Sequence, residues 1–113
     1  MNKISRKCAE KKILLIHLST DYIFDGNQDI AYTEESIPNP INFYGLSKLA
    51  GEQNIINSLS DYLIIRTSWI FSEKGKNFFK SIFKNSRIEN VLEIIGDQVG
   101  SPTYAGDLSL IHI

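Results

Sequence analysis

The stretch Ile13-Leu14-Leu15-Ile16-His17-Leu18-Ser19-Thr20-Asp21-Tyr22 joins a short apolar run directly to a group of polar side chains. A continuous apolar run of this length is typical of a parallel β-strand covered on both faces, so residues 13–18 predict a strand in the middle of a sheet. Thr20 then follows the carboxyl end of the strand, where ligands bind in open α/β sheets. His17, inside the run, is predicted to be a hydrogen-bonded core histidine and not a ligand.

Helix and strand patterns alternate along the rest of the chain. Residues 25–42 contain glycine, asparagines and two prolines, and predict a long surface loop. A helix is predicted over residues 43–59, with Asn42 as its N-cap. The expected buried face of this helix consists of Leu46, Leu49, Ala50 and Ile56.

Further elements are predicted on both sides of this helix. Residues 1–12 are expected to be the end of a helix and a solvated connector. The expected later elements are a buried strand over 62–66, a helix over 76–86 with an apolar stripe of Phe78, Phe79, Ile82 and Phe83, a third strand over 91–95, and a last helix capped by Thr103. This alternation predicts an α/β fold, a partial doubly wound parallel sheet of Rossmann-like type.

Tyr44 and Lys48 are four residues apart in the predicted helix, which puts both side chains on one helix face. An ammonium group beside a tyrosine favours the phenolate and suits the phenol to general acid catalysis at neutral pH. The spacing by itself is also typical of a solvated helix face. The hydroxyl of Thr20 at the end of a predicted strand supplies a third group, and the three side chains together predict a proton-transfer site.

Composition excludes several classes of partner. The chain has 113 residues, 42% hydrophobic and 22% charged, which predicts a soluble globular chain of one-domain size. A net charge of −1 gives no basic field, so neither nucleic acid nor a membrane surface is predicted as a partner. No apolar stretch is long enough to span a membrane. The single cysteine, Cys8, fits a cytoplasmic location. The sequence contains no cluster of histidines and cysteines, so no transition-metal site is predicted.

Four blocks of sequence together carry a resemblance to a known family. They are Ser19-Thr20-Asp21-Tyr22-Ile23-Phe24-Asp25-Gly26, Asn39-Pro40-Ile41-Asn42-Phe43-Tyr44-Gly45-Leu46-Ser47-Lys48-Leu49-Ala50-Gly51-Glu52, Arg66-Thr67-Ser68-Trp69, and Asp97-Gln98-Val99-Gly100-Ser101-Pro102-Thr103-Tyr104-Ala105-Gly106-Asp107-Leu108. In this order they resemble the dTDP-4-dehydrorhamnose reductase family of the extended short-chain dehydrogenase/reductase superfamily. The resemblance implies an NAD(P)-binding fold and the reduction of dTDP-4-dehydro-β-L-rhamnose to dTDP-L-rhamnose by NADPH or NADH.

The resemblance also implies roles for individual residues. Tyr44 would be the proton donor, Lys48 would assist it and bind the nicotinamide ribose, and Thr20 would orient the keto oxygen. The implied catalytic residues are Thr20, Tyr44 and Lys48; the implied cofactor-binding residues are Tyr44, Lys48, Arg66, Thr67 and Ser68; and the implied substrate-binding residues are Thr20, Asp21, Tyr22 and Trp69. The full-length enzyme would bind a nucleotide-sugar in the cytoplasm, with Mg²⁺ and a homodimer as further options.

Binding of a dinucleotide pyrophosphate requires a glycine-rich turn between a strand and a helix. The sequence contains no such turn. The glycines at 26, 45, 51, 75, 96, 100 and 106 do not have the required spacing. The chain is therefore expected to be a central fragment of an enzyme about twice its length or more. Residues 1–95 would form the later part of the dinucleotide-binding fold and residues 96–108 the start of the substrate-binding region, while residues 108–113 receive no functional assignment.

Two alternatives stay open at this point. One is a non-catalytic binding or regulatory module of the same fold, and the other is a different nucleotide-sugar reductase or an epimerase. Retention of Thr20, Tyr44 and Lys48 together favours descent from an enzyme. Trp69 and the block 97–107 resemble the reductase more than an epimerase.

Overall fold

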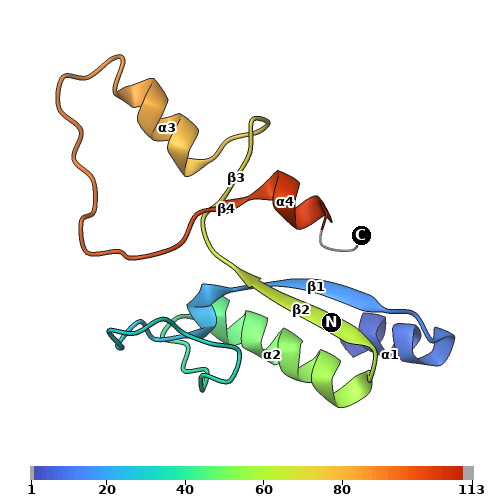
Figure 1. Cartoon of the computed structure of the whole chain (residues 1–113). Coiled ribbons are helices and arrows are strands. Elements are labelled where there is room, and N and C mark those ends of the chain that lie inside the picture. Colours follow the sequence, from blue (N-terminus) through green and yellow to red (C-terminus); the bar gives the residue numbers. More distant parts are fainter. Residues whose placement is uncertain (1, 111–113) are drawn as a thin grey trace. The chain divides into compact units, whose positions relative to one another are not determined.

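The computed structural model describes residues 2–110, which form two compact units, residues 2–67 and residues 68–110. Figure 1 shows the course of the chain through both units. The predicted division of the chain into residues 1–95 and 96–108 stays a prediction.

The first unit is a parallel strand pair with two helices. Its elements are α1 (Asn2–Lys11), β1 (Leu15–Thr20), the 3-10 helix η1 (Asp21–Ile23), α2 (Phe43–Ser58) and β2 (Tyr62–Thr67). The strands β1 and β2 pair in parallel, from Leu15 opposite Tyr62 to Thr20 opposite Thr67. Figure 1 shows α2 running along one face of the pair, and α1 packs against α2. The predicted α/β class with parallel strands is confirmed.

The first strand begins two residues later than predicted because α1 ends in a tight helix-terminating motif. Lys12 adopts a left-handed conformation with φ of 54°. The amide of Ile13 donates to Cys8 O and that of Lys12 to Ala9 O, which is the Schellman pattern of a helix end. Residues 1–12 were expected to hold only the end of a helix, whereas α1 occupies ten residues of this segment. At its other end β1 extends further than predicted, because Thr20 pairs with Thr67, so Thr20 is the last residue of the strand and does not follow it.

The prediction that the first strand is covered on both faces is wrong for the described chain. Ile16, Leu18 and Leu63 remain 37%, 44% and 40% exposed. Alternate residues of a strand point to opposite faces, and Arg66 of β2 points to the face that α2 covers, where it contacts Glu52. The apolar side chains on the other face therefore have no helix over them within the first unit.

The long helix is confirmed, but its predicted buried face is wrong. Asn42 is its N-cap as predicted, because its Oδ1 accepts a hydrogen bond from Gly45 N at 2.7 Å. Leu46 and Ile56 are 54% and 43% exposed. Of the two other residues expected to be buried, Ala50 is exposed and Leu49 is half-buried. The buried residues of α2 are Gly45, Gly51, Glu52 and Ile55. The charged Glu52 faces inward because it pairs with Arg66 on β2.

The predicted loop between η1 and α2 is confirmed, and Asp25 organises it. The Asp25 carboxylate accepts hydrogen bonds from Asn27 N at 3.0 Å, Tyr32 Oη at 2.8 Å and Asn39 Nδ2 at 2.8 Å. These bonds, that of the Asn27 amide most of all, lower the pKa of Asp25 to about 2. Tyr32 also stacks on Phe24, with ring centroids 4.2 Å apart. The loop is therefore held in a defined shape.

The second unit consists of short elements around an aromatic cluster. Its elements are β3 (Ile70–Phe71), α3 (Phe78–Asn85), β4 (Thr103–Tyr104) and α4 (Ala105–Leu110). The strands β3 and β4 pair in parallel. Phe71 contacts both Phe79 and Tyr104, with ring centroids 5.0 and 5.5 Å apart. The helix predicted over 76–86 is confirmed in a shorter form that begins after Asn77, whose side chain accepts from Lys80 N.

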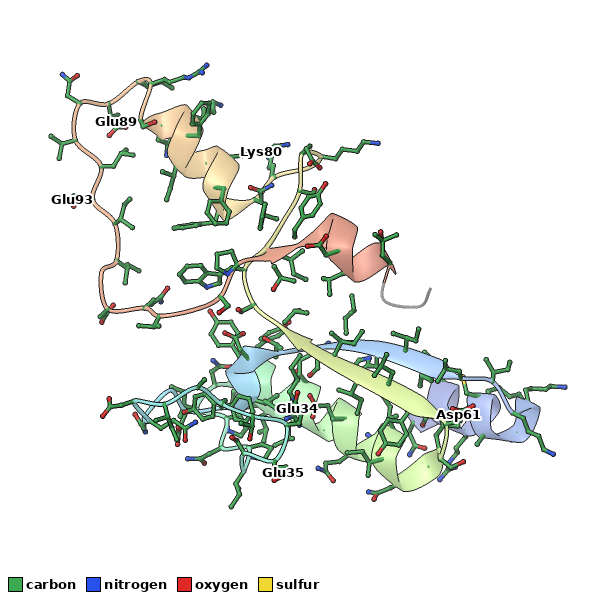
Figure 2. All side chains as sticks on the ribbon, in the orientation of Figure 1. Glu34, Glu35, Asp61, Lys80, Glu89 and Glu93 are labelled. Carbon is green, nitrogen blue, oxygen red and sulfur yellow. The ribbon has the colours of Figure 1, made fainter. Side chains whose placement is uncertain are left out.

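Two predictions in the second unit are wrong. Residues 91–95 are not a strand but part of an irregular connection from α3 to β4, along which Figure 2 shows Glu89 and Glu93. A strand needs a partner, and none pairs with this segment among residues 2–110. Thr103 does not cap the last helix, because it lies in β4, where its amide donates to Trp69 O at 3.3 Å, and α4 begins only at Ala105. Within the segment 108–113, residues 111–113 lie outside the described part.

We predict that the loop loses order in acid through Asp25. A carboxyl group whose pKa falls on folding stabilises the folded loop above its ordinary pKa of 3.8, and this contribution disappears as the pH falls through about 2. Amide exchange of Asn27, corrected for its intrinsic rate, should therefore accelerate between about pH 4 and pH 2. In Asp25→Asn this transition should be absent, whereas the exposed control Asp29→Asn should retain it. An unchanged transition in Asp25→Asn would contradict this assignment.

Candidate active site

One face of α2 carries Tyr44, Lys48 and Glu52 at successive intervals of four residues. Glu52 is fully buried, and its carboxylate accepts two hydrogen bonds from Arg66, at 3.3 Å from Nε and 2.8 Å from Nη2. Tyr44, at the start of the helix, is 53% exposed. The face thus runs from a buried anchor at one end to an accessible phenol at the other.

Lys48 lies between these two and reaches the carboxyl end of β1. Its Nζ donates to Leu18 O at 2.6 Å, which brings the ammonium group close to the strand that ends at Thr20. The Lys48 charge also acts on His17 of the same strand. Burial chiefly lowers the pKa of His17, and the Lys48 charge lowers it further.

His17 differs in one respect from the sequence prediction. Its Nε2 is buried and makes no hydrogen bond to any residue of the described chain, and the same is true of Ser19 Oγ. His17 is therefore a half-buried histidine beneath α2, but the hydrogen bond predicted for a core histidine is not present at Nε2.

The hydroxyl of Thr20 is held by its own neighbours. Thr20 Oγ1 donates to Asp21 Oδ1 at 3.1 Å and accepts from Tyr22 N at 3.3 Å, which makes Thr20 the N-cap of η1. The Tyr22 ring meets the Tyr44 ring edge to face, with centroids 5.8 Å apart and planes at 82°. The structure thus brings the turn after β1 into contact with the start of α2.

The side chains of Arg66 and Thr67 are engaged inside the first unit. Arg66 pairs with Glu52 and also lies over the Phe24 ring, with Cζ 5.4 Å from its centroid. Thr67 Oγ1 donates to Ser19 O at 3.2 Å. No role was predicted for Glu52. The available signal was its spacing, one turn beyond Lys48 on the predicted helix.

Ser68 and Trp69 belong to the second unit, and their predicted roles stay predictions. Ser68 Oγ donates to Ser101 O at 2.6 Å. Trp69 has a φ of 43°, a rare left-handed conformation for a bulky residue. Its indole lies so close to Gly100 that a Cβ there would be 3.0 Å from the ring. Trp69 also helps to line a cavity of about 460 Å³ between α3 and the segment 92–98.

Neither a metal centre nor a membrane-spanning helix is present in residues 2–110. These residues contain no group of three or more histidine, cysteine, aspartate or glutamate side chains placed to hold a metal ion. The expected option of Mg²⁺ therefore gains no support. No helix in this range is long and apolar enough to cross a membrane.

The parallel strands β1 and β2, joined by the crossover helix α2, are part of a Rossmann-like α/β fold. Residues 1–113 match the family model of the RmlD substrate binding domain, and the chain belongs to this family. The predicted family resemblance is confirmed.

Several relatives and solved structures are similar to the chain. It is 43% identical over 107 residues to a dTDP-4-dehydrorhamnose reductase of Sinorhizobium fredii and 37% identical over 108 residues to a dTDP-4-keto-6-deoxy-D-glucose reductase of Streptomyces niveus. Each match covers 95% of this chain but only 36% and 38% of the relatives. A dTDP-4-dehydrorhamnose reductase of Bacillus anthracis, solved in complex with NADP, matches with a TM-score of 0.91 and 36% identity over 98% of this chain and 40% of that one. The chain thus spans little more than a third of these proteins.

We predict that Glu52→Gln destabilises the first unit. The substitution keeps the shape of the side chain but leaves the Arg66 guanidinium without its anionic partner, and only 25% of the Arg66 side chain is exposed. Because water reaches Arg66 in part, the expected loss is about 1–3 kcal/mol of unfolding free energy. Urea unfolding followed by circular dichroism measures it. Glu34, which is labelled in Figure 2, lies on an exposed loop, so Glu34→Gln is the control and should unfold like the parent. Equal midpoints for all three proteins would show that the pair contributes little.

Proposed function

We propose that this chain is the catalytic part of an NADPH-dependent reductase that converts dTDP-4-dehydro-β-L-rhamnose to dTDP-L-rhamnose. The observation that carries the proposal is the Lys48 Nζ to Leu18 O bond. This bond joins the helix that bears Tyr44 and Lys48 to the end of the strand that bears Thr20. The names of the relatives support the same activity.

Reduction of the C4 keto group requires one proton on the keto oxygen. As the C4 keto group is reduced, negative charge develops on its oxygen, and the Tyr44 phenol donates the proton that neutralises it. The Lys48 ammonium group stabilises the phenolate that remains. The single hydroxyl proton of Thr20 now points to Asp21, so Thr20 must turn this proton away from Asp21 in order to donate to the keto oxygen.

The residues present fit the nicotinamide end of the cofactor. Lys48 and Tyr44 lie at the carboxyl end of β1, the edge at which such sheets bind their ligands. NADPH supplies the hydride when bound. Lys48 would bind its ribose, and residues 66–68 would contact it mainly through their backbone, since the side chains of Arg66 and Thr67 are already engaged.

The sugar would be bound from the turn after β1. Asp21 and Tyr22 lie there, and the Tyr22 ring is 49% exposed, so it is free to contact a ligand. Trp69 would offer a flat apolar face to the pyranose. The Streptomyces niveus relative is named for a dTDP-linked 4-keto-6-deoxy-D-glucose, which makes a stereoisomeric sugar the main competing substrate. A cytoplasmic location and a homodimer of the complete enzyme belong to the same proposal.

The test uses a hybrid enzyme, in which residues 2–110 of this chain replace the matching segment of the Sinorhizobium fredii reductase. Oxidation of NADPH is followed with dTDP-4-dehydro-L-rhamnose and with dTDP-4-keto-6-deoxy-D-glucose as alternative substrates. Turnover of dTDP-4-dehydro-L-rhamnose supports the proposal. Turnover of dTDP-4-keto-6-deoxy-D-glucose alone would indicate a dTDP-4-keto-6-deoxy-D-glucose reductase instead. A folded hybrid that binds NADPH but reduces neither sugar would favour the non-catalytic alternative.

In this hybrid, we predict that Tyr44→Phe lowers kcat by about 10²-fold or more, because it removes only the proton donor. Affinity for the nucleotide-sugar, measured by calorimetry, should stay close to that of the parent. Tyr62→Phe is the matched control, since Tyr62 begins β2 at the opposite end of the strand pair from Thr20. Equal rates for Tyr44→Phe and the parent would contradict the assignment.

The 113-residue chain by itself should show no measurable NADPH affinity. It has no glycine-rich turn to bring backbone amides to the pyrophosphate. The exposed apolar face of its strand pair should also cause self-association. Calorimetry with NADPH and analytical ultracentrifugation measure the two properties. Saturable micromolar binding by a folded monomer would refute this expectation.

A further inference from the structure

Gly45 is the point at which α2 touches the backbone of the turn after β1. It is buried in the first turn of the helix, directly after Tyr44. A Cβ atom added to Gly45 would lie 2.0 Å from Tyr22 O and 2.8 Å from Tyr22 C. Both are main-chain atoms, so a change of side-chain rotamer cannot relieve the contact.

The backbone conformation does not explain the glycine. The glycines with positive φ are Gly26 and Gly75, whereas Gly45 lies within a regular helix. Glycine in a helix interior is destabilising relative to alanine. At Gly45, the close approach of the helix to Tyr22 is therefore the feature that excludes a side chain.

The two segments that meet at Gly45 are each fixed by other bonds. On the helix side, Asn42 Oδ1 accepts from Gly45 N. On the turn side, Thr20 Oγ1 accepts from Tyr22 N, and Phe24 N donates to Asp21 O at 2.9 Å. Because both sides are held, the space left at Gly45 sets how closely they approach.

We propose that Gly45 is a positioning residue that sets the distance between the Tyr44 phenol and the Thr20 hydroxyl. The role rests on the proposed reductase function. With alanine at this position the helix start must retreat by about 1 Å, because real Cβ atoms are essentially never found within 3.0 Å of such an atom. Tyr44 and Lys48 would move with the helix, whereas Thr20 is held in the pairing of β1 with β2.

A displacement of this size matters for catalysis. A misplacement of about 1 Å in a reacting group can lower the rate by about 10²-fold. The displacement separates the proton donor from the hydroxyl that orients the keto oxygen, yet it leaves Tyr44 and Lys48 together on one helix. Gly45→Ala should therefore lower kcat without changing the shape of the pH–rate profile.

The structural arm of the test does not depend on reductase activity. In the hybrid protein, nuclear Overhauser effects between selectively labelled Tyr22 and Tyr44 rings report the edge-to-face contact. They should be present in the parent and lost or much weaker in Gly45→Ala. The control Gln53→Ala, at an exposed position of the same helix, should keep them. Equal effects in parent and Gly45→Ala would overturn the proposal.

The kinetic arm uses the hybrid enzyme, with rates expressed per bound NADPH so that unfolded protein does not count. Gly45→Ala should lose about 10²-fold in kcat with little change in the KM for NADPH, and Gln53→Ala should match the parent. A lower melting temperature with an unchanged kcat would reduce Gly45 to a packing role and overturn the proposal. An inactive hybrid would count against the proposed function. The ring contacts would still decide whether Gly45 sets the distance between the start of α2 and the turn after β1.

A second variant covers the case in which Gly45→Ala does not fold. Asn42→Ala removes the cap that holds Gly45 N and adds no atom at the contact. It should loosen the helix start, weaken the ring contacts and lower kcat by less than Gly45→Ala is expected to. Loss of stability with parental ring contacts and parental kcat would overturn the proposal.

Discussion

The ion pair between Glu52 and Arg66 fixes the arrangement of the first unit. A fully buried carboxylate needs a charged partner, and Arg66 supplies it through two hydrogen bonds from β2. The same guanidinium lies over Phe24, which stacks on Tyr32, and Tyr32 donates to Asp25. One buried charge thus ties the helix to the strand, and through aromatic contacts it also holds the loop that leads into the helix.

The pair also limits how α2 can rotate about its axis. Glu52, Lys48 and Tyr44 share one helix face, so a rotation that buries Glu52 necessarily directs Lys48 toward β1. The anchor and the proposed catalytic pair are therefore not independent. This constraint also explains why Leu46 is exposed, since it lies about 120° around the helix from Glu52 and cannot be buried within the first unit without withdrawing Glu52 from Arg66.

The sequence predicted what depends on local chemistry and missed what depends on distant partners. The cap at Asn42 follows from a side chain that bonds its own helix start, and it was predicted correctly. The strand expected over 91–95 has the right apolar residues but no neighbouring strand to pair with. The helix end expected within residues 1–12 is present, but its position was not predicted, because its left-handed turn uses Lys12 where glycine is the usual signal. The buried face of α2 was misjudged because hydrophobicity cannot show that Glu52 has a partner in Arg66.

The apolar run 13–18 is typical of a strand covered on both faces, although one face of the strand pair is partly exposed. Parallel strands are normally covered on both faces, and their sequences are correspondingly apolar on both. In this chain, α2 covers one face, and Ile16, Leu18 and Leu63 on the other remain partly exposed. The relatives are nearly three times as long as the segment that they share with this chain. The apolar pattern of β1 therefore fits a sheet whose second layer comes from segments that the relatives have outside the shared region. On this argument the polar edge around Thr20 and Tyr44 needs only the first unit for its internal geometry, whereas the stability of the sheet depends on contacts made beyond it.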